Sequence, residues 1–244
     1  MNTQRFDGID ALRGVALVWM TAFHLGFDLN HFGYWRQDFY HDPFWTWQRA
    51  CILGLFLFCA GLGQAVALEQ GQPWARFWRR WAQVAGCAVL VSAGSFLMYP
   101  RSFIFFGVLH GFALMLVIVR LTGAWGPWLW LAGALAIGAA PGAAALLAHG
   151  PWEGLFNSGW LSWLGFVTVK PVTEDYVPLL PWLGVMWWGM AAGQWWLRGE
   201  RPRARPLPGA LQPLAVLGRW SLSFYMLHQP LMIGGLMLLA AVRA

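Results

Sequence analysis

The stretch IDALRGVALVWMTAFHLGFDLNHF, residues 9–32, is apolar enough to cross a bilayer, yet six of its polar side chains share one helix face. They are Asp10, Arg13, Thr21, His24, Asp28 and His31. At about 100° per residue, an α-helix places all six within a stripe about 80° wide. An ionisable group that faces lipid costs a few kcal/mol or more. We therefore expect this face of the helix to line the interior of a bundle or a wet cavity.

Composition predicts an integral membrane protein. Of 244 residues, 59% are hydrophobic and only 11% are charged, against about 25% charged in a soluble domain. Nineteen Trp and seventeen Phe suit aromatic belts at membrane interfaces. Because the apolar runs are long and have a helical period, the predicted fold is an all-α transmembrane bundle, a single domain over residues 1–244.

Seven membrane spans are expected, at residues 9–29, 45–69, 76–98, 103–120, 124–148, 177–197 and 214–241. With this count, eleven of the sixteen Lys and Arg residues fall on the N-terminal side of the bilayer and five on the other. The positive-inside rule then makes the N-terminus cytoplasmic. No cleavable signal peptide is expected, so we predict a multi-pass protein of a bacterial inner membrane.

The net charge of +6 does not indicate a nucleic-acid partner, because the basic residues lie in loops between spans, where orientation and lipid headgroups explain them. Cys51, Cys59 and Cys87 lie in apolar runs without CxxC spacing. We expect three small buried hydrophobes and no metal site. P-loop, GxSxG and HExxH motifs are absent, which argues against soluble-type nucleotide and hydrolase chemistry.

Two loops are long enough to contribute to a site, and both fall on the predicted external side. Residues 30–44 hold several ionisable side chains: His31, Arg36, Asp38, His41 and Asp42. Residues 149–176 place Trp152, Phe156, Trp160 and Trp163 at helical spacing, which predicts an amphipathic helix in the membrane interface. That helix either anchors the protein or forms a lid over an external site.

His24 is the strongest candidate for chemistry. It follows Asp10 by 14 residues, about 21 Å along a helix, and Asp28 lies one turn further on. A carboxylate at i+4 can orient an imidazole and raise its basicity, as a general base requires; the alternative is a hydrogen-bonded core histidine. Arg13 either pairs with Asp10 or binds the phosphates of a cytoplasmic ligand.

Other polar residues recur further along the chain. His110 lies within the GxxxG formed by Gly107 and Gly111. It therefore either belongs to a close helix contact or takes part in the chemistry of the site. A second polar stripe, in the last span, either bonds helices together or contacts a ligand; its members are Ser221, Tyr225, His228 and Gln229. Before the sixth span, Asp175 and Tyr176 either cap and seat that helix or bind a ligand near Pro181.

Four blocks together resemble a known family: RFDGIDALRGVALVWMTAFHLGFDLNHFG (5–33), SFIFFGVLHG (102–111), DYVPLLPWLGV (175–185) and LGRWSLSFYMLHQPL (217–231). They are similar to the catalytic domain of heparan-alpha-glucosaminide N-acetyltransferase and its short bacterial relatives, and the opening block to wider membrane acyltransferases. The resemblance covers nearly the whole chain. The lysosomal enzyme has more spans and a lumenal domain that this chain lacks, so heparan is not carried over as the substrate.

The resemblance implies transfer of acetyl from cytoplasmic acetyl-CoA to an external amine or hydroxyl, assisted by a histidine. The catalytic candidates are His24, Asp28 and His31, since the family places its active histidine after the first span, where His31 or His41 could stand. The matched blocks and Arg49 supply the donor-binding candidates: Asp10, Arg13, Arg49, His110, Tyr176, Trp182, Ser221, Tyr225 and His228.

The sequence thus predicts a membrane acetyltransferase that uses acetyl-CoA on an envelope saccharide or another small external acceptor, directly or through an acetyl-histidine. A small-solute transporter could use the same polar stripe, although no internal repeat is visible. A structural or partner-binding membrane protein is the third alternative. Small-residue faces also make homo-oligomers possible.

Overall fold

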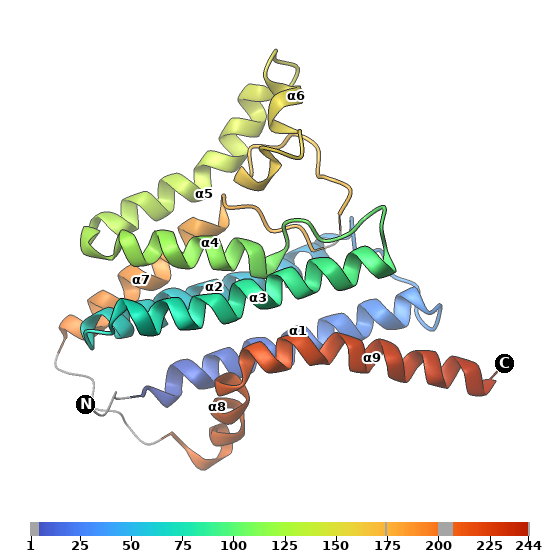
Figure 1. Ribbon diagram of the computed structural model, residues 1–244, viewed down its shortest axis with the longest axis horizontal. Helices are drawn as coiled ribbons and strands as arrows, with labels where there is room; N and C mark the ends of the chain where they lie inside the picture. The colour runs from blue at the N-terminus through green and yellow to red at the C-terminus, as the bar shows by residue number, and fades with distance from the viewer. Residues whose placement is uncertain (1–4, 174, 200–206, 244) are drawn as a thin grey trace. The chain divides into compact units, whose positions relative to one another are not determined.

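The computed structural model describes residues 5–173, 175–199 and 207–243 of the chain, and the regular secondary structure in these ranges is helical (Figure 1). The longer helices are α1 (Asp7–His31), α2 (Pro43–Glu69), α3 (Trp74–Met98), α4 (Val108–Leu121), α5 (Trp128–Leu147), α7 (Trp182–Arg198), α8 (Gln212–Arg219) and α9 (Ser221–Arg243). The short ones are α6 (Glu153–Phe156), η1 (Gly123–Trp125), η2 (Ser162–Leu164) and η3 (Gly209–Leu211). No strand occurs in these ranges, which confirms the all-α prediction.

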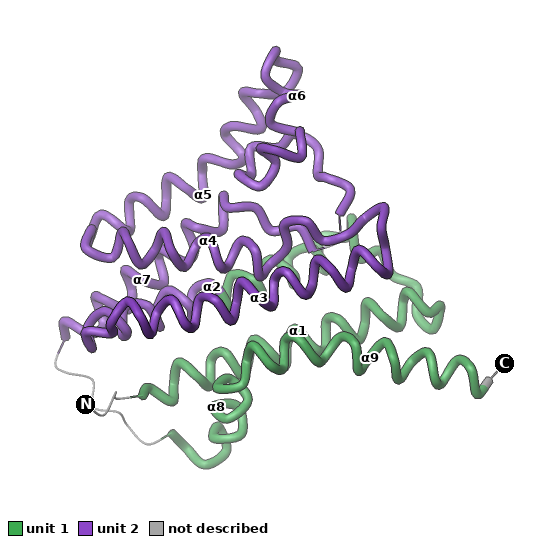
Figure 2. The backbone as a smooth tube through the Cα atoms, viewed as in Figure 1, with its two compact units in different colours: residues 1–56, 203–244 green, residues 57–202 purple. Residues whose placement is uncertain are grey.

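The chain divides into two compact units (Figure 2). Unit 1 comprises residues 1–56 and 203–244, and unit 2 comprises residues 57–202, so the division falls inside α2. Unit 1 therefore joins the two ends of the chain, and each unit has its own helix packing.

In unit 1, α1 packs against α8 and lies beside α9 (Figure 1). Two glycines allow this close approach: a Cβ on Gly14 would overlap the carbonyl of Leu214, and one on Gly218 would overlap the carbonyl of Asp10. Next to this crossing is an apolar cluster of Leu17, Met20 and Ile52 with Phe23, Phe56, Leu217, Phe224 and Tyr225. Glycine at the crossing and apolar side chains beside it hold the first and last helices together.

Two contacts along α1 show the direction in which the last part of the chain runs relative to it. Asp10, near the start of α1, lies against Gly218, and Asp28, near its end, contacts Gln229. The first helix and the last part of the chain therefore run the same way.

In unit 2, α7 packs against α4, α5 and residues 57–69 of α2. Glycines again lie at the contacts. A Cβ on Gly61 would overlap the carbonyl of Met186, and one on Gly189 would overlap that of Phe58. Small residues let the helix backbones approach closely in both units, as in membrane helix pairs generally.

Within the described part of the chain, four helices are long and apolar enough to cross a membrane: α2, α3, α5 and α9. The 14-residue α4 is apolar but shorter. The membrane class predicted from composition agrees with these helices, whereas the count of seven spans and the cytoplasmic N-terminus stay predictions.

Three of the predicted spans differ from the observed helices. The sixth, expected from residue 177, begins only at Trp182. The fourth, expected from residue 103, begins only at Val108, because residues before it pair with a distant loop: Val177 N–H donates to the Phe106 carbonyl at 3.3 Å. The last, expected as one helix over 214–241, ends at Arg219 and restarts at Ser221, and α8 turns away from α9 (Figure 1). Packing of α8 across α1 at Gly218 accounts for this break.

The predicted amphipathic helix over 149–176 is wrong. Only Glu153–Phe156 is α-helical, and Trp160 lies in a turn. The reason is side-chain competition: Asn157 Oδ1 accepts the backbone N–H of Thr168 at 3.0 Å, and Glu153 Oε1 accepts the Thr168 hydroxyl at 2.7 Å. These bonds fold the segment back on itself instead of extending a helix.

The cysteines correct a second expectation. Cys59 is buried and Cys87 is partly buried, but Cys51 is exposed, so the prediction of three buried hydrophobes is wrong at Cys51.

Candidate active site

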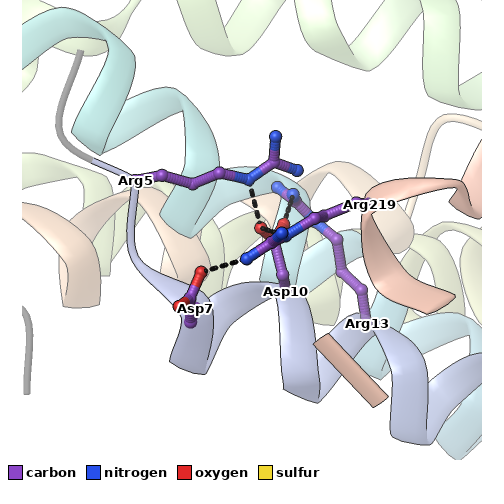
Figure 3. A network of polar contacts seen from close by, with 5 residues as sticks. All are labelled: Arg5, Asp7, Asp10, Arg13 and Arg219. Atoms are coloured by element: carbon purple, nitrogen blue, oxygen red, sulfur yellow. Dashed lines mark hydrogen bonds and ion pairs between the residues drawn. The ribbon is translucent and has the colours of Figure 1, made fainter. Parts of the chain in front are cut away.

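The polar stripe of α1 separates into two groups, one at each end of the helix. At the start, the buried carboxylate of Asp10, 3% exposed, lies among three arginines (Figure 3). Arg5 Nε donates to it at 2.5 Å, Arg13 NH1 donates at 3.0 Å, and Arg219 Nε lies 3.8 Å away. Arg219 NH2 also donates to Asp7 at 2.7 Å. Of the two roles that the sequence leaves open for Arg13, the structure shows the ion pair with Asp10.

This group ties the start of α1 to the end of α8, and it carries three positive and two negative charges. Among these five described side chains, the positive charges exceed the negative ones by one. A site with a surplus guanidinium beside one buried carboxylate, Asp10, and one partly exposed carboxylate, Asp7, can hold one anionic group of a ligand.

At the other end of α1, two histidines and a carboxylate meet. The ring centroids of His24 and His228 are 5.2 Å apart, and Gln229 Nε2 donates to Asp28 Oδ1 at 2.7 Å. The predicted pairing of His24 with Asp28 is absent among the described residues, where the carboxylate takes Gln229 of α9 instead. His24, Asp28, His228 and Gln229 are called the acceptor cluster below.

The acceptor cluster contains three buried atoms with no partner in the described chain: Asp28 Oδ2, His228 Nε2 and Gln229 Oε1. All three accept hydrogen bonds. Gln229 must present its oxygen, since its nitrogen donates to Asp28. His228 Nδ1 lies 2.7 Å from the Tyr225 carbonyl, which can only accept, so Nδ1 carries the proton and Nε2 is an acceptor. Unsatisfied buried acceptors are rare and costly, and their presence indicates a place for a donor-bearing ligand.

The remaining unit 1 candidates lie around these two groups. Tyr225 packs in the apolar cluster, with its ring 5.8 Å from that of His228, and Ser221 is the first residue of α9. His31, at the end of α1, and Arg49 of α2 are exposed. His41 is exposed too, and its Nδ1 lies 3.0 Å from Asp38 Oδ2. The backbone N–H of His41, followed by its side chain, lowers the pKa of Asp38.

In unit 2, His110 is bonded on both ring nitrogens. Gly107 N–H donates to its Nδ1 at 3.3 Å, and Nε2 donates to Ser92 Oγ at 3.1 Å. The Ser92 hydroxyl in turn donates to the Ile104 carbonyl at 2.5 Å. These bonds cap the start of α4 and join it to α3, so His110 has a packing role. Binding of acetyl-CoA by His110 stays a prediction.

Asp175 and Tyr176 also bond within unit 2. The predicted capping of the sixth span by Asp175 is replaced by capping of α4, because Asp175 Oδ2 accepts the Val108 N–H at 3.3 Å. The Tyr176 hydroxyl donates to the Ser162 carbonyl at 2.5 Å, and burial raises the pKa of Tyr176 to about 12. Trp182 is the first residue of α7.

Sequence reasoning missed the partners of these residues. The site residues predicted from the sequence do not include Arg5, Asp7 or Arg219. Asp7 precedes Asp10 by three residues, so the two share a helix face, and this spacing is a signal that could have identified Asp7. Gln229 was placed on the polar stripe of the last span but not paired with Asp28, from which it is 201 residues distant. No local signal predicts a pairing at that separation.

Residues 5–230 match the family model described as heparan-alpha-glucosaminide N-acetyltransferase, catalytic. The chain belongs to this family. Membership assigns this N-acetyltransferase homologue to the transmembrane acetyltransferases, and the match takes in both the acceptor cluster and the arginine group of unit 1. No curated protein and no solved structure matches the chain.

Proposed function

We propose that the protein transfers acetyl from acetyl-CoA to the amine of an external amino sugar or a similar envelope saccharide, with His24 as general base. The observation that carries this proposal is the acceptor cluster. Asp28, His228 and Gln229 present three buried acceptors, and one of them belongs to a carboxylate that is 3% exposed.

A primary ammonium group suits this arrangement. It supplies three N–H donors and a positive charge, and it could therefore satisfy the three acceptors and balance Asp28 at once. A sugar hydroxyl supplies one donor and no charge, which would leave the carboxylate unbalanced in a buried site. Amine acceptors are therefore favoured over hydroxyl acceptors.

The proposed chemistry needs one proton transfer before bond formation. His24 takes a proton from the bound ammonium, and the neutral amine attacks the thioester carbonyl. The C–N bond forms and the C–S bond breaks. The nitrogen, positively charged after the attack, loses a second proton, and the CoA thiolate that leaves takes up this proton. His24 is proposed for this role because it lies beside these acceptors, with its ring centroid 5.2 Å from that of His228, and no carboxylate of the described chain binds its ring.

The donor would bind at the other end of α1. The surplus positive charge of Arg5, Arg13 and Arg219 over Asp7 and Asp10 suits a CoA phosphate. Asp10 and His24 are 14 residues apart, about 21 Å along the helix. An extended thioester arm along α1 would then carry the acetyl group from the cytoplasmic to the external side.

We place the N-terminus in the cytoplasm and the protein in a bacterial inner membrane with seven spans. The parallel course of the first and last helices in unit 1 supports an odd number of spans. The positive-inside bias of the sequence supports the orientation.

The experiment is a transfer assay on the detergent-purified full chain with radiolabelled acetyl-CoA. Glucosamine and glucose serve as matched amine and hydroxyl acceptors. We expect labelled N-acetylglucosamine, little labelled glucose, and at least about 100-fold less product from His24→Ala while acetyl-CoA still binds.

The other outcomes are equally informative. Loss of transfer only in His31→Ala or His41→Ala would keep the reaction and contradict His24 as the base. A folded wild type that neither binds acetyl-CoA nor acetylates either sugar, but moves a labelled solute across proteoliposomes, would replace the enzyme with a transporter.

A further inference from the structure

Unit 2 contains a small pocket between the start of α5 and the end of α7. Its volume is about 120 Å³, and its lining includes Gly126, Trp130, Gln194, Trp195 and Arg198. At about 30 Å³ per water molecule, it holds about four waters. That space suits a small polar headgroup and is too small for a nucleotide or an acyl chain.

Gln194 contributes a hydrogen-bond acceptor to this region. Its Nε2 donates to the Gly123 carbonyl at 2.6 Å, which leaves Oε1 as the other end of the amide. Gln194 Oε1 is buried and has no partner in the ranges that the structure describes. A ligand with an N–H or O–H group would satisfy it.

Arg198 contributes a cation. It is the last residue of α7, its side chain is exposed, and it lines the same pocket. One guanidinium nitrogen lies 3.4 Å from the position that a Cβ on Gly126 would take, and Gly126 has a φ of +58°. Glycine at this turn thus leaves room for the guanidinium, whose planar fork suits a phosphate.

Two indoles complete the pocket. Trp130 is 44% exposed and Trp195 is 74% exposed. Indole faces attract ammonium groups, and indoles gather at the membrane–water interface, where lipid headgroups lie.

We propose that this pocket binds the headgroup of a phospholipid that carries a primary ammonium group, with its phosphate on Arg198 and its ammonium on Gln194 and the two indoles. Ethanolamine lipids have both groups. Choline lipids have the same phosphate and charge, but their quaternary nitrogen has no N–H for Gln194. The pocket should therefore distinguish these two headgroups, and this site is separate from the residues of the proposed reaction.

The test is native mass spectrometry of the full chain, released from micelles that contain equal amounts of phosphatidylethanolamine and phosphatidylcholine with identical acyl chains. We expect the wild type to retain the ethanolamine lipid about tenfold more than the choline lipid.

Arg198→Gln should lower retention of both lipids. Gln194→Leu should remove the preference. Trp195→Ala, at an exposed position where folding is not at risk, should lower retention of both lipids, because an indole attracts either ammonium group. Arg79→Gln, an exposed arginine on α3, is the matched control and should change neither.

Competition identifies the source of the phosphate. Soluble phosphoethanolamine should displace the bound lipid, whereas inorganic phosphate at the same concentration should not. Equal retention of both lipids by the wild type, an unchanged preference in Gln194→Leu, or unchanged retention of both lipids in Trp195→Ala would each overturn the proposal. Displacement by inorganic phosphate alone would show a free-phosphate site instead.

Discussion

The acceptor cluster of unit 1 and the His110 group of unit 2 look alike in sequence and differ in their hydrogen bonds. Both place a histidine and small polar residues in apolar helices. Both ring nitrogens of His110 are bonded, and its Ser92 partner passes a bond on to Ile104. The acceptor cluster leaves three buried acceptors without donors in the described chain. A fully bonded group stabilises the fold, whereas an unsatisfied one costs stability and is best explained by a ligand.

The largest expected effect comes from Asp28→Asn in the acceptor cluster. The Asn amide can still accept from Gln229 Nε2, and its own nitrogen can donate to Gln229 Oε1. The free energy of unfolding should therefore stay the same or rise by about 1 kcal/mol. Transfer should fall about 100-fold in kcat/KM for the amine, because the charge that holds the ammonium is gone. Thermal melting together with the transfer assay measures both, and a fall in stability with normal transfer would contradict the ligand role.

At His110 we expect the reverse: a loss of stability with no loss of transfer by the protein that remains folded. His110→Ala removes the bonds to Gly107 and Ser92 and leaves a space at the start of α4. We expect a loss of about 2 kcal/mol in the free energy of unfolding, visible as a lower melting temperature in detergent. His110→Gln, which can keep one bond, should recover part of it. Loss of transfer beyond the fall in folded protein would instead return His110 to the site.

A smaller effect is expected at Tyr176, whose hydroxyl is hydrogen-bonded within unit 2. Tyr176→Phe removes the bond to the Ser162 carbonyl and should lower the free energy of unfolding by about 1–2 kcal/mol, whereas Tyr99→Phe, at an exposed tyrosine, should not change it measurably.

Burial raises the pKa of the Tyr176 hydroxyl, and this makes the stability depend on pH. The unfolded phenol ionises near pH 10 and the native one near pH 12, so the contribution is complete below pH 10 and is lost as the pH rises toward 12. Melting curves of the wild type and Tyr176→Phe should therefore converge over that range.

The smallest effect is expected at Glu153, in the exposed loop of unit 2. The Thr168 hydroxyl, followed by the His149 N–H, holds the pKa of Glu153 below its ordinary value of 4.5. The ionised form therefore stabilises the loop above pH 4.5, and this contribution is lost as the pH falls through the lowered pKa. Glu153→Gln should melt slightly below the wild type at pH 7 and equal it in acid. A difference that is independent of pH would point to packing instead of charge.

The sequence alone predicted the helices well where their signals are local. Hydropathy and the 3.6-residue period predicted the all-α class and the long apolar helices, and periodicity placed His24 and Asp28 on one face. The four matched blocks predicted the family. Prediction failed at residues 214–241, where Gly218 packs on Asp10 from the other end of the chain. It failed also at residues 149–176, where the side chain of Asn157 accepts the Thr168 N–H and folds the segment back on itself.

Sequence by itself therefore determined the class of this protein, its membrane character and the faces on which its polar residues lie, because hydropathy and helical period are properties of neighbouring residues. Tertiary structure decided which of those residues are bonded. Asp28 takes Gln229 from the other end of the chain instead of His24 four residues away, and His110 is bonded by Ser92 of the preceding helix. A hydrogen bond needs two groups within about 3 Å, and only the packing of helices brings distant residues that close.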